Sequence, residues 1–259
     1  MVQRKYVAIQ KRKKRLVLFV RFFIVIVLFG LWEIAGRLQW IDTFLFSSPS
    51  ELIRALFEID KNGSVIRHTG VTLYETIFSF LLTVFLSLMI AVLLWYCTTV
   101  SEILEPFLVA LNSLPKSALA PLLIVWLGTG LKTIIIAGMS VAIFGSIINL
   151  YYSFRSSNEE YTRLIRTLGG NRYHILIKII LPGSIPVIIS NMKVNIGLCL
   201  VGVIIGEFLA AREGLGYLII YSTQIFRLDW LIMSILILCI IALSLYFLLH
   251  FFERIFRKY

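Results

Sequence analysis

Long runs of apolar residues dominate the chain and restrict the folds that it can adopt. Three of these runs, Thr76–Cys97, Thr133–Phe154 and Trp230–Phe252, contain no Asp, Glu, Lys or Arg. About 20 apolar residues suffice to cross the hydrocarbon core of a bilayer as a helix, which satisfies its own backbone polar groups. Hydrophobic residues make up 59% of the chain and charged residues only 15%, which excludes a soluble domain. We therefore expect an all-α integral membrane protein.

Six segments have the length and composition of membrane-spanning helices. They are residues 16–36, 72–97, 106–128, 133–154, 183–206 and 230–252. The first follows a basic leader, as the apolar part of a signal peptide would. However, it contains Trp32 and Glu33 and has no clear small-x-small cleavage site, so we interpret it as an uncleaved anchor.

Basic residues are distributed unevenly around these spans. Lys and Arg are concentrated before the first span, in a polar segment at 156–182 and at the C-terminus. Because basic residues near span ends accumulate on the cytoplasmic side, we expect both termini and the polar segment in the cytoplasm, and the chain in the cytoplasmic (inner) membrane. The net charge of +11 follows this topology. The expected partner of the basic N-terminal cluster is the anionic surface of the lipid bilayer. The positive charge therefore does not indicate binding to nucleic acid.

The polar segment Ser156–Pro182 is longer than a connection between two spans needs to be, which indicates a docking surface outside the bilayer. Asn158 can cap a helix whose first turn carries Glu159 and Glu160, where carboxylates suit the positive end of the helix dipole. Apolar side chains then recur at i, i+3, i+4 and i+7 and form one stripe: Tyr161, Leu164, Ile165 and Leu168. The run Gly169-Gly170-Asn171 should end this helix.

A second short helix should follow in the same segment. Its apolar residues again have helical spacing, and Pro182 should end it; these residues are Tyr173, Leu176, Ile177 and Ile180. The segment is therefore predicted to be a helix-turn-helix hairpin lying at the membrane surface.

The span at 106–128 is predicted to face a water-filled pathway. Three prolines interrupt it, and polar residues lie inside it: Pro106, Pro115 and Pro121, with Asn112, Ser113, Lys116 and Ser117. Proline leaves carbonyl groups without a donor, which is tolerated at membrane depth only against protein or a water-filled cavity.

The span at 183–206 should line the same pathway. Asn191, Lys193 and Asn195 recur within two of its turns. A lysine at the bilayer centre costs at least about 2.5–3.5 kcal/mol. Lys116 and Lys193 therefore either line a path that favours an anionic solute, or reach the interface or pair with a buried carbonyl. Glu207 ends this span, and we weigh a gate residue against a solvated carboxylate at a helix end.

A short interfacial helix is expected outside the membrane, between the first two spans. Ser48-Pro49-Ser50-Glu51 has the pattern of a capping box with proline at the first helical position. Apolar residues continue at helical spacing as far as Ile59.

Several of these residues also resemble a known family. Gly169, nine residues and then Ile179-Ile180-Leu181-Pro182 resemble the second half of the cytoplasmic "EAA" signature of binding-protein-dependent ABC importer permeases. The first half is absent, because Arg163-Leu164-Ile165 stands where the family has Glu-Ala-Ala. Two further pieces resemble the nitrate, sulfonate and taurine branch: Leu114–Leu122 followed by Trp126-Leu127-Gly128, and Glu207 followed by Gly214-Leu215-Gly216.

The resemblance implies a type I ABC importer permease fold with a cytoplasmic coupling-helix hairpin. Residues 1–67 would form the N-terminus, anchor and external segment, 68–253 the transmembrane domain with the coupling loop at 156–182, and 254–259 a cytoplasmic tail. The implied ATPase-coupling residues are Tyr161, Arg163, Leu164, Ile165, Leu168, Gly169, Gly170, Leu181 and Pro182. The translocation path would include Asn112, Lys116, Ser117, Asn191, Lys193, Asn195 and Glu207.

The implied partners are two copies of a cytoplasmic ABC ATPase, an extracytoplasmic solute-binding protein and a second copy of the permease, with a heterodimer as the alternative. The chain would be a transport subunit and not an enzyme. It would bind no cofactor or metal itself, since ATP and Mg²⁺ belong to the ATPase. The expected solute is a small anion such as a sulfonate, taurine or nitrate. The alternatives are bicarbonate or a vitamin precursor such as a thiamine pyrimidine.

Two other classes fit the residues less well. A channel or secondary transporter that works without ATP would leave the hairpin unexplained, and secondary transporters need coupling-ion sites such as intramembrane carboxylates. A membrane-embedded enzyme would need clustered nucleophiles or metal ligands, which the sequence pattern does not suggest.

Overall fold

The computed structural model describes residues 2–60 and 64–256, and all its regular secondary structure is helical. Five helices are long and apolar enough to cross a membrane: α1 (Val2–Arg37), α4 (Ser64–Tyr96), α7 (Leu131–Arg155), α10 (Leu181–Ala210) and α12 (Leu228–Phe256). The pair α5 (Thr98–Ser113) and α6 (Lys116–Leu127), bent by 98°, makes a sixth span if it is counted as one. The expected all-α membrane fold is confirmed.

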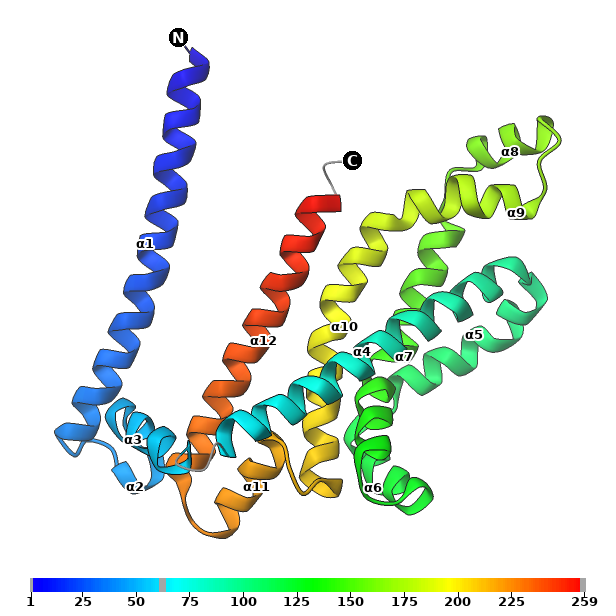
Figure 1. The fold of residues 1–259 in the computed structure, drawn as a ribbon. Helices are drawn as coiled ribbons and strands as arrows, with labels where there is room; N and C mark the ends of the chain where they lie inside the picture. The colour runs from blue at the N-terminus through cyan, green and yellow to red at the C-terminus, as the bar shows by residue number, and fades with distance from the viewer. Residues whose placement is uncertain (1, 61–63, 257–259) are drawn as a thin grey trace.

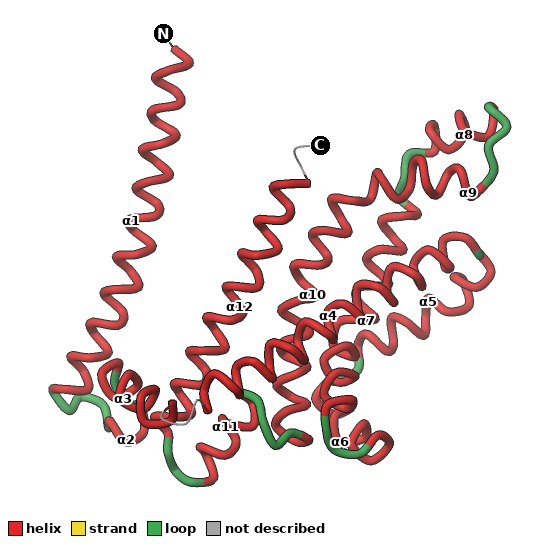
Figure 2. Tube along the Cα trace, in the orientation of Figure 1, coloured by secondary structure: helices red, strands yellow, loops and turns green. Residues whose placement is uncertain are grey.

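The shorter helices lie at the two ends of this bundle (Figures 1 and 2). The helices α8 (Glu159–Thr167) and α9 (Arg172–Ile175) form one end, called here the hairpin end. The start of α1 and the end of α12 lie on the same side. At the opposite end lie α2 (Thr43–Phe46), α3 (Pro49–Asp60) and α11 (Leu215–Gln224). The basic segments of the sequence therefore share one end of the molecule. Residues 257–259 of the expected tail lie outside the described residues.

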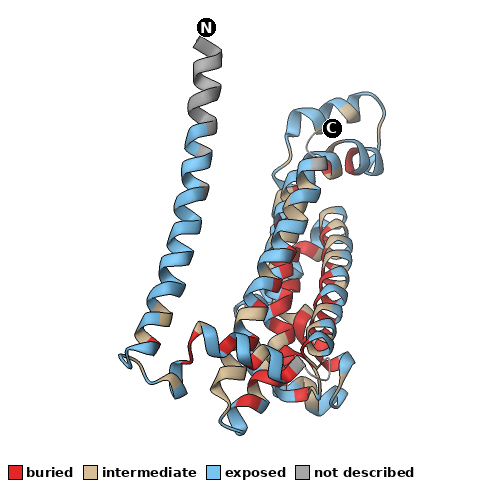
Figure 3. Ribbon diagram, turned by 60° about the vertical axis from the view of Figure 1, so that its left-hand side comes forward, coloured by how far each residue is buried: buried red, intermediate tan, exposed pale blue. Residues whose placement is uncertain are grey.

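The buried centre of the bundle is formed by α4, α7 and α10, whereas α1 is exposed along its apolar length (Figure 3). Small polar side chains join the three central helices. The Ser146 hydroxyl of α7 donates to Ser87 Oγ of α4 at 2.8 Å, and accepts from the Asn191 and Asn195 amides of α10 at 2.6 and 2.9 Å. Every one of these buried groups thus has a partner, as burial away from water requires.

The helix expected between the first two spans is confirmed as α3, and it and the residues just before it contact the C-terminal end of α1. Trp32 Nε1 donates to the Ser47 carbonyl at 3.2 Å, and Glu33 accepts from Ser50 N at 3.1 Å. Half of the expected capping box forms, since Glu51 N donates to Ser48 Oγ at 3.4 Å. The other half does not, because the Glu51 carboxylate instead accepts from the Ser47 hydroxyl.

The expectation that Pro182 ends the second hairpin helix is wrong. From α9 the chain continues through a π-helical turn, η1 (Leu176–Ile180), directly into α10, and the whole stretch Arg172–Ala210 is one candidate span of 39 residues. In a regular helix the Pro182 ring would clash with the carbonyl four residues earlier. The π turn relieves this clash, because its wider ring bonds Leu181 N to the Leu176 carbonyl five residues back.

The expectation that three prolines interrupt the 106–128 span is also only partly correct. Pro106 and Pro121 lie inside α5 and α6. The break occurs at Pro115, because a residue before proline is pushed into extended conformation, and Leu114 has ψ 140°.

We expect Gly202→Ala to lower the thermal midpoint of the purified protein. A Cβ at Gly202 would lie 2.7 Å from the Val141 side chain and 2.8 Å from the Ala137 carbonyl oxygen, where α10 meets α7. Such overpacking costs about 1–3 kcal/mol, more than the gain of about 1 kcal/mol in helix propensity.

Gly197→Ala on the same helix is the matched control for this change. A Cβ there meets no heavy atom within 4 Å, so this variant should keep or raise the midpoint. Equal midpoints for the two variants would contradict the close contact between α7 and α10.

Candidate functional site

The hairpin begins and turns as its sequence predicts. Asn158 Oδ1 accepts from Glu160 N at 2.8 Å and so caps α8. After α8, Gly169 has φ +80°, a left-handed conformation that a side chain would strain. Asn171 then caps α9, because its side chain accepts from His174 N at 3.1 Å while His174 Nδ1 accepts from Asn171 N. Local sequence thus determines where both short helices begin.

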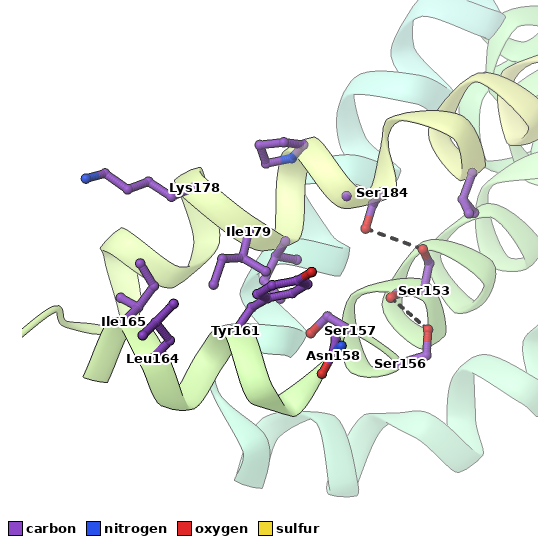
Figure 4. Close-up of a pocket in the computed structure, with 14 residues that line it drawn as sticks. Ser153, Ser156, Ser157, Asn158, Tyr161, Leu164, Ile165, Lys178, Ile179 and Ser184 are labelled. Carbon is purple, nitrogen blue, oxygen red and sulfur yellow. Dashed lines mark hydrogen bonds between the residues drawn. The ribbon is translucent and has the colours of Figure 1, made fainter. Parts of the chain in front are cut away.

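The predicted apolar stripe of α8 opens onto a groove of about 600 Å³ (Figure 4). Tyr161, Leu164 and Ile165 form one side of the groove, and residues of η1 and the start of α10, including Ile179 and Pro182, form the other. Tyr161 and Leu164 are exposed, and Leu168 at the tip is 75% exposed. An apolar surface of this kind, unburied at the end of a span, is typical of a protein contact site.

The hairpin has a basic side next to this groove. A depression of about 420 Å³ is lined by arginines together with Trp95 and Glu159; the arginines are Arg155, Arg163, Arg166 and Arg172. Arg163 forms an exposed ion pair with Glu159 at 2.9 Å. Arg172 donates to the Tyr96 carbonyl at 2.7 Å and so ties α9 to the end of α4. Sequence reasoning missed Arg155 and Arg172, whose only signal was a positive charge near a span end.

The broken span places its lysine at the break. Lys116 Nζ donates to the Leu111 and Asn112 carbonyls at 2.7 and 2.9 Å, which are carbonyl groups at the end of α5. The ammonium group also lies 5.4 Å from the centre of the Phe144 ring of α7. Lys116 therefore pairs with carbonyls freed by the break, while Asn112 and Ser117 beside it are exposed.

The polar residues of α10 divide between two faces. Asn191 and Asn195 bond to Ser146 inside the bundle and are buried. Lys193 instead pairs with Glu253 of α12 and lies 3.4 Å from His250 Nδ1, with only 15% of its side chain exposed. The structure therefore does not bring Lys116 and Lys193 together, since they contact different helices.

Glu207 is not a solvated carboxylate, because it is only 1% exposed. It accepts from the Thr72 hydroxyl of α4 at 2.7 Å and from the Gly216 amide at the start of α11. Glu75 of α4 is buried within hydrogen-bonding range of it. Sequence reasoning missed Glu75, although a carboxylate at the edge of a charge-free span was a visible signal. Glu75 and Glu207 meet because α4 and α10 pack against each other. These helices are far apart in the sequence, so residue spacing within one helix could not predict the contact.

We expect Arg172→Leu to loosen the hairpin without unfolding the bundle. The change removes the charge-assisted bond from Arg172 to the Tyr96 carbonyl. Amide hydrogen exchange over residues 158–175 should rise roughly fivefold, equivalent to about 1 kcal/mol of local stability.

Arg166→Leu is the control for this change, because the Arg166 side chain is exposed and makes no hydrogen bond within the described part of the chain. It should leave exchange near wild type. Unchanged exchange in Arg172→Leu would mean that this contact does not hold the hairpin.

The chain matches the family model described as "Binding-protein-dependent transport system inner membrane component" over residues 83–258. It is 31% identical to a "probable ABC transporter permease protein" of Haemophilus influenzae, over 88% of this chain and 94% of that protein.

Two more distant relatives carry substrate names. The formylaminopyrimidine transport permease protein of Halalkalibacterium halodurans is 25% identical, over 74% of this chain and 76% of its own length. The taurine transport system permease protein of Escherichia coli is 24% identical, over 85% and 82%. The fold is similar to that of a chain of the MetNI methionine ABC transporter in an inward-facing conformation, with a TM-score of 0.64 at 18% identity, covering 75% of this chain and 95% of that one.

Proposed function

The chain belongs to the family of inner membrane components of binding-protein-dependent transport systems, and on that premise we propose how it couples to its partners and what it carries. Membership makes it the permease of an ABC importer, a transport component and not an enzyme. It also implies an ATPase and a solute-binding protein as partners. ATP and Mg²⁺ belong to the ATPase.

The hairpin is the ATPase-docking element in this proposal. Its exposed Tyr161, Leu164 and Leu168 offer apolar surface that a groove on the ATPase could bury. The arginines on the adjacent side would complement acidic residues of the ATPase, a role in which Arg163 replaces the missing carboxylate of the family signature. Two copies of the permease would each engage one ATPase, with the hairpin and both termini in the cytoplasm.

The observation that carries this proposal is the continuity of α9 with α10. A push on the hairpin acts on a helix that runs without interruption from Arg172 to Ala210. Through Asn191 and Asn195 the same helix is bonded to Ser146 of α7. Movement of the docked ATPase would therefore tilt α10 and α7 together as rigid elements. The π turn at Leu176–Ile180 supplies the point at which the angle can change.

The pathway would lie between two copies of the chain. The exposed residues at the break of the bent span support this, because Asn112 and Ser117 have no cover in one copy. We propose a homodimer, in which this face of each copy lines the path; a heterodimer with a related permease is the alternative.

The proposed solute is a small anion of the taurine and sulfonate type. The taurine relative and the position of the half-buried Lys116 at the break support an anion. A vitamin precursor is the second candidate, favoured by the formylaminopyrimidine relative at similar identity. It is favoured further because Lys116 and Lys193 both already have partners within the chain.

We expect Gly169→Asp and Leu168→Arg to abolish uptake while the protein stays in the membrane. A side chain at Gly169 strains the turn by about 1 kcal/mol or more and projects toward the docked partner. Leu168 is exposed, so arginine there alters the docking surface and not the core. Both variants should co-purify less ATPase or stimulate its hydrolysis less.

Leu45→Arg is the matched control, because Leu45 is a similarly exposed apolar residue at the opposite end of the bundle. It should retain uptake and bound ATPase. Normal uptake together with normal co-purification in Gly169→Asp would remove the assignment of the hairpin as the coupling element.

We expect Lys116→Met to lower uptake of an anionic solute several-fold and to spare a neutral one. The substitution removes the positive charge at the break of the bent span. Lys193→Met is the comparison, since it breaks the link to Glu253 and should lower the thermal midpoint more than the uptake per molecule. If taurine is transported and Lys116→Met leaves its uptake unchanged, Lys116 does not contribute to an anion path.

A further inference from the structure

The backbone amides at the start of α11 donate hydrogen bonds to side chains of two other helices. Gly214 N donates to His68 Nδ1 at 3.0 Å, and Leu215 N donates to Thr72 Oγ1 at 2.8 Å; both acceptors belong to α4. Gly216 N donates to the Glu207 carboxylate of α10. An ionised carboxylate suits this place, because the start of a helix carries partial positive charge. Glu207 thus holds α11 against α10, and Thr72 links both to α4.

Glu75 brings a second carboxyl group to the same buried place. It is 2% exposed and lies one turn of α4 after Thr72, whose hydroxyl donates to Glu207 at 2.7 Å, so the two carboxyl groups are neighbours in the same buried place. Two ionised carboxylates this close would repel each other without water to screen them. Each is also only an acceptor, so a hydrogen bond between them requires a proton on one of the two.

The surroundings decide which carboxyl group carries the proton. Glu207 already accepts from the Thr72 hydroxyl and the Gly216 amide, and both bonds favour the ionised form. Glu75 Oε2 is buried with no hydrogen-bond partner among the described residues. The carbonyl oxygen of a neutral acid tolerates that situation far better than an oxygen of an ionised carboxylate.

No other charge in the described structure replaces this proton. Among the residues whose side chains the structure describes, neither carboxyl group forms an ion pair with a Lys or Arg. Arg67 of α4 and Glu213 of the loop between α10 and α11 pair with each other. His68 accepts a hydrogen bond from Gly214 N through Nδ1, so that nitrogen carries no proton.

We propose that Glu75 and Glu207 form a proton-binding site that holds one proton on Glu75, and that this site locks α11 to α4 and α10. The proton is the ligand, and the bond from Glu75 to Glu207 completes the capping of α11. The glycines at the start of α11 make room for the Glu207 side chain, because a Cβ at Gly214 or Gly216 would lie 2.4 or 2.8 Å from it. The inference goes beyond the proposed function, since it does not depend on the solute or on the ATPase contact.

Two matched substitutions test the position of the proton. Glu75→Gln keeps a donor toward Glu207 and should leave the thermal midpoint of the purified protein near wild type. Glu207→Gln removes the charge that caps α11 and should lower the midpoint and reduce uptake roughly tenfold. Glu102→Gln, an exposed glutamate of α5, is the control for loss of a carboxylate. Equal losses in Glu75→Gln and Glu207→Gln would overturn the assignment.

Infrared spectroscopy of the purified protein at neutral pH can detect a protonated carboxylic acid directly. The wild type should show the carbonyl band of a protonated carboxylic acid, and Glu75→Gln should lose it while Glu102→Gln keeps it. Absence of the band in the wild type, or its survival in Glu75→Gln, would refute the shared proton. Because this measurement needs neither solute nor ATPase, its failure is distinguishable from failure of the transport proposal.

Discussion

The absence of water inside a bilayer is the constraint on which the rest of this structure depends, because every backbone polar group there needs a partner within the protein. In a regular helix the backbone N–H and carbonyl groups bond to each other, so the helix satisfies this constraint without side chains. At two of the irregular points a side chain supplies the missing partner. Lys116 donates to the carbonyls freed at the break after α5. His68, Thr72 and Glu207 accept from the first amides of α11. Some of the polar residues inside the spans therefore lie where the backbone departs from a helix, and others, such as Ser146 and Asn191, join regular helices to one another.

The same constraint explains how the hairpin is joined to the bundle. A helix that stopped at the membrane surface would leave its last carbonyls to be satisfied separately. Here α9 instead passes through a π turn into α10, so that backbone bonding continues across Pro182. As a result, one side of the groove at the hairpin end is part of the same helix that lies at the centre of the bundle. Small residues such as Gly202 let this helix approach α7 closely, and the asparagines bond it to Ser146.

Much of the fold could be predicted because apolar length and local capping are properties of contiguous residues. Asn158 caps α8, the turn at Gly169 is left-handed, and α3 begins at Pro49. Predictions from single prolines were less successful. Pro106 and Pro121 lie within helices, and Pro182 is accommodated by the π turn. The effect of a proline depends on whether the carbonyl group four residues before it can move away from the ring.

The sequence by itself determined the class of the protein, its candidate membrane-spanning segments and the residues that form the hairpin, since hydropathy, charge distribution and caps act over neighbouring residues. Only the tertiary structure decided which polar residues meet. Lys193 pairs with Glu253 on α12, whereas Asn191 and Asn195 of the same span bond inward. Glu207 is buried beside Glu75, more than a hundred residues away. Such contacts depend on how helices rotate and pack against one another, and helical spacing within one segment carries no information about its partner.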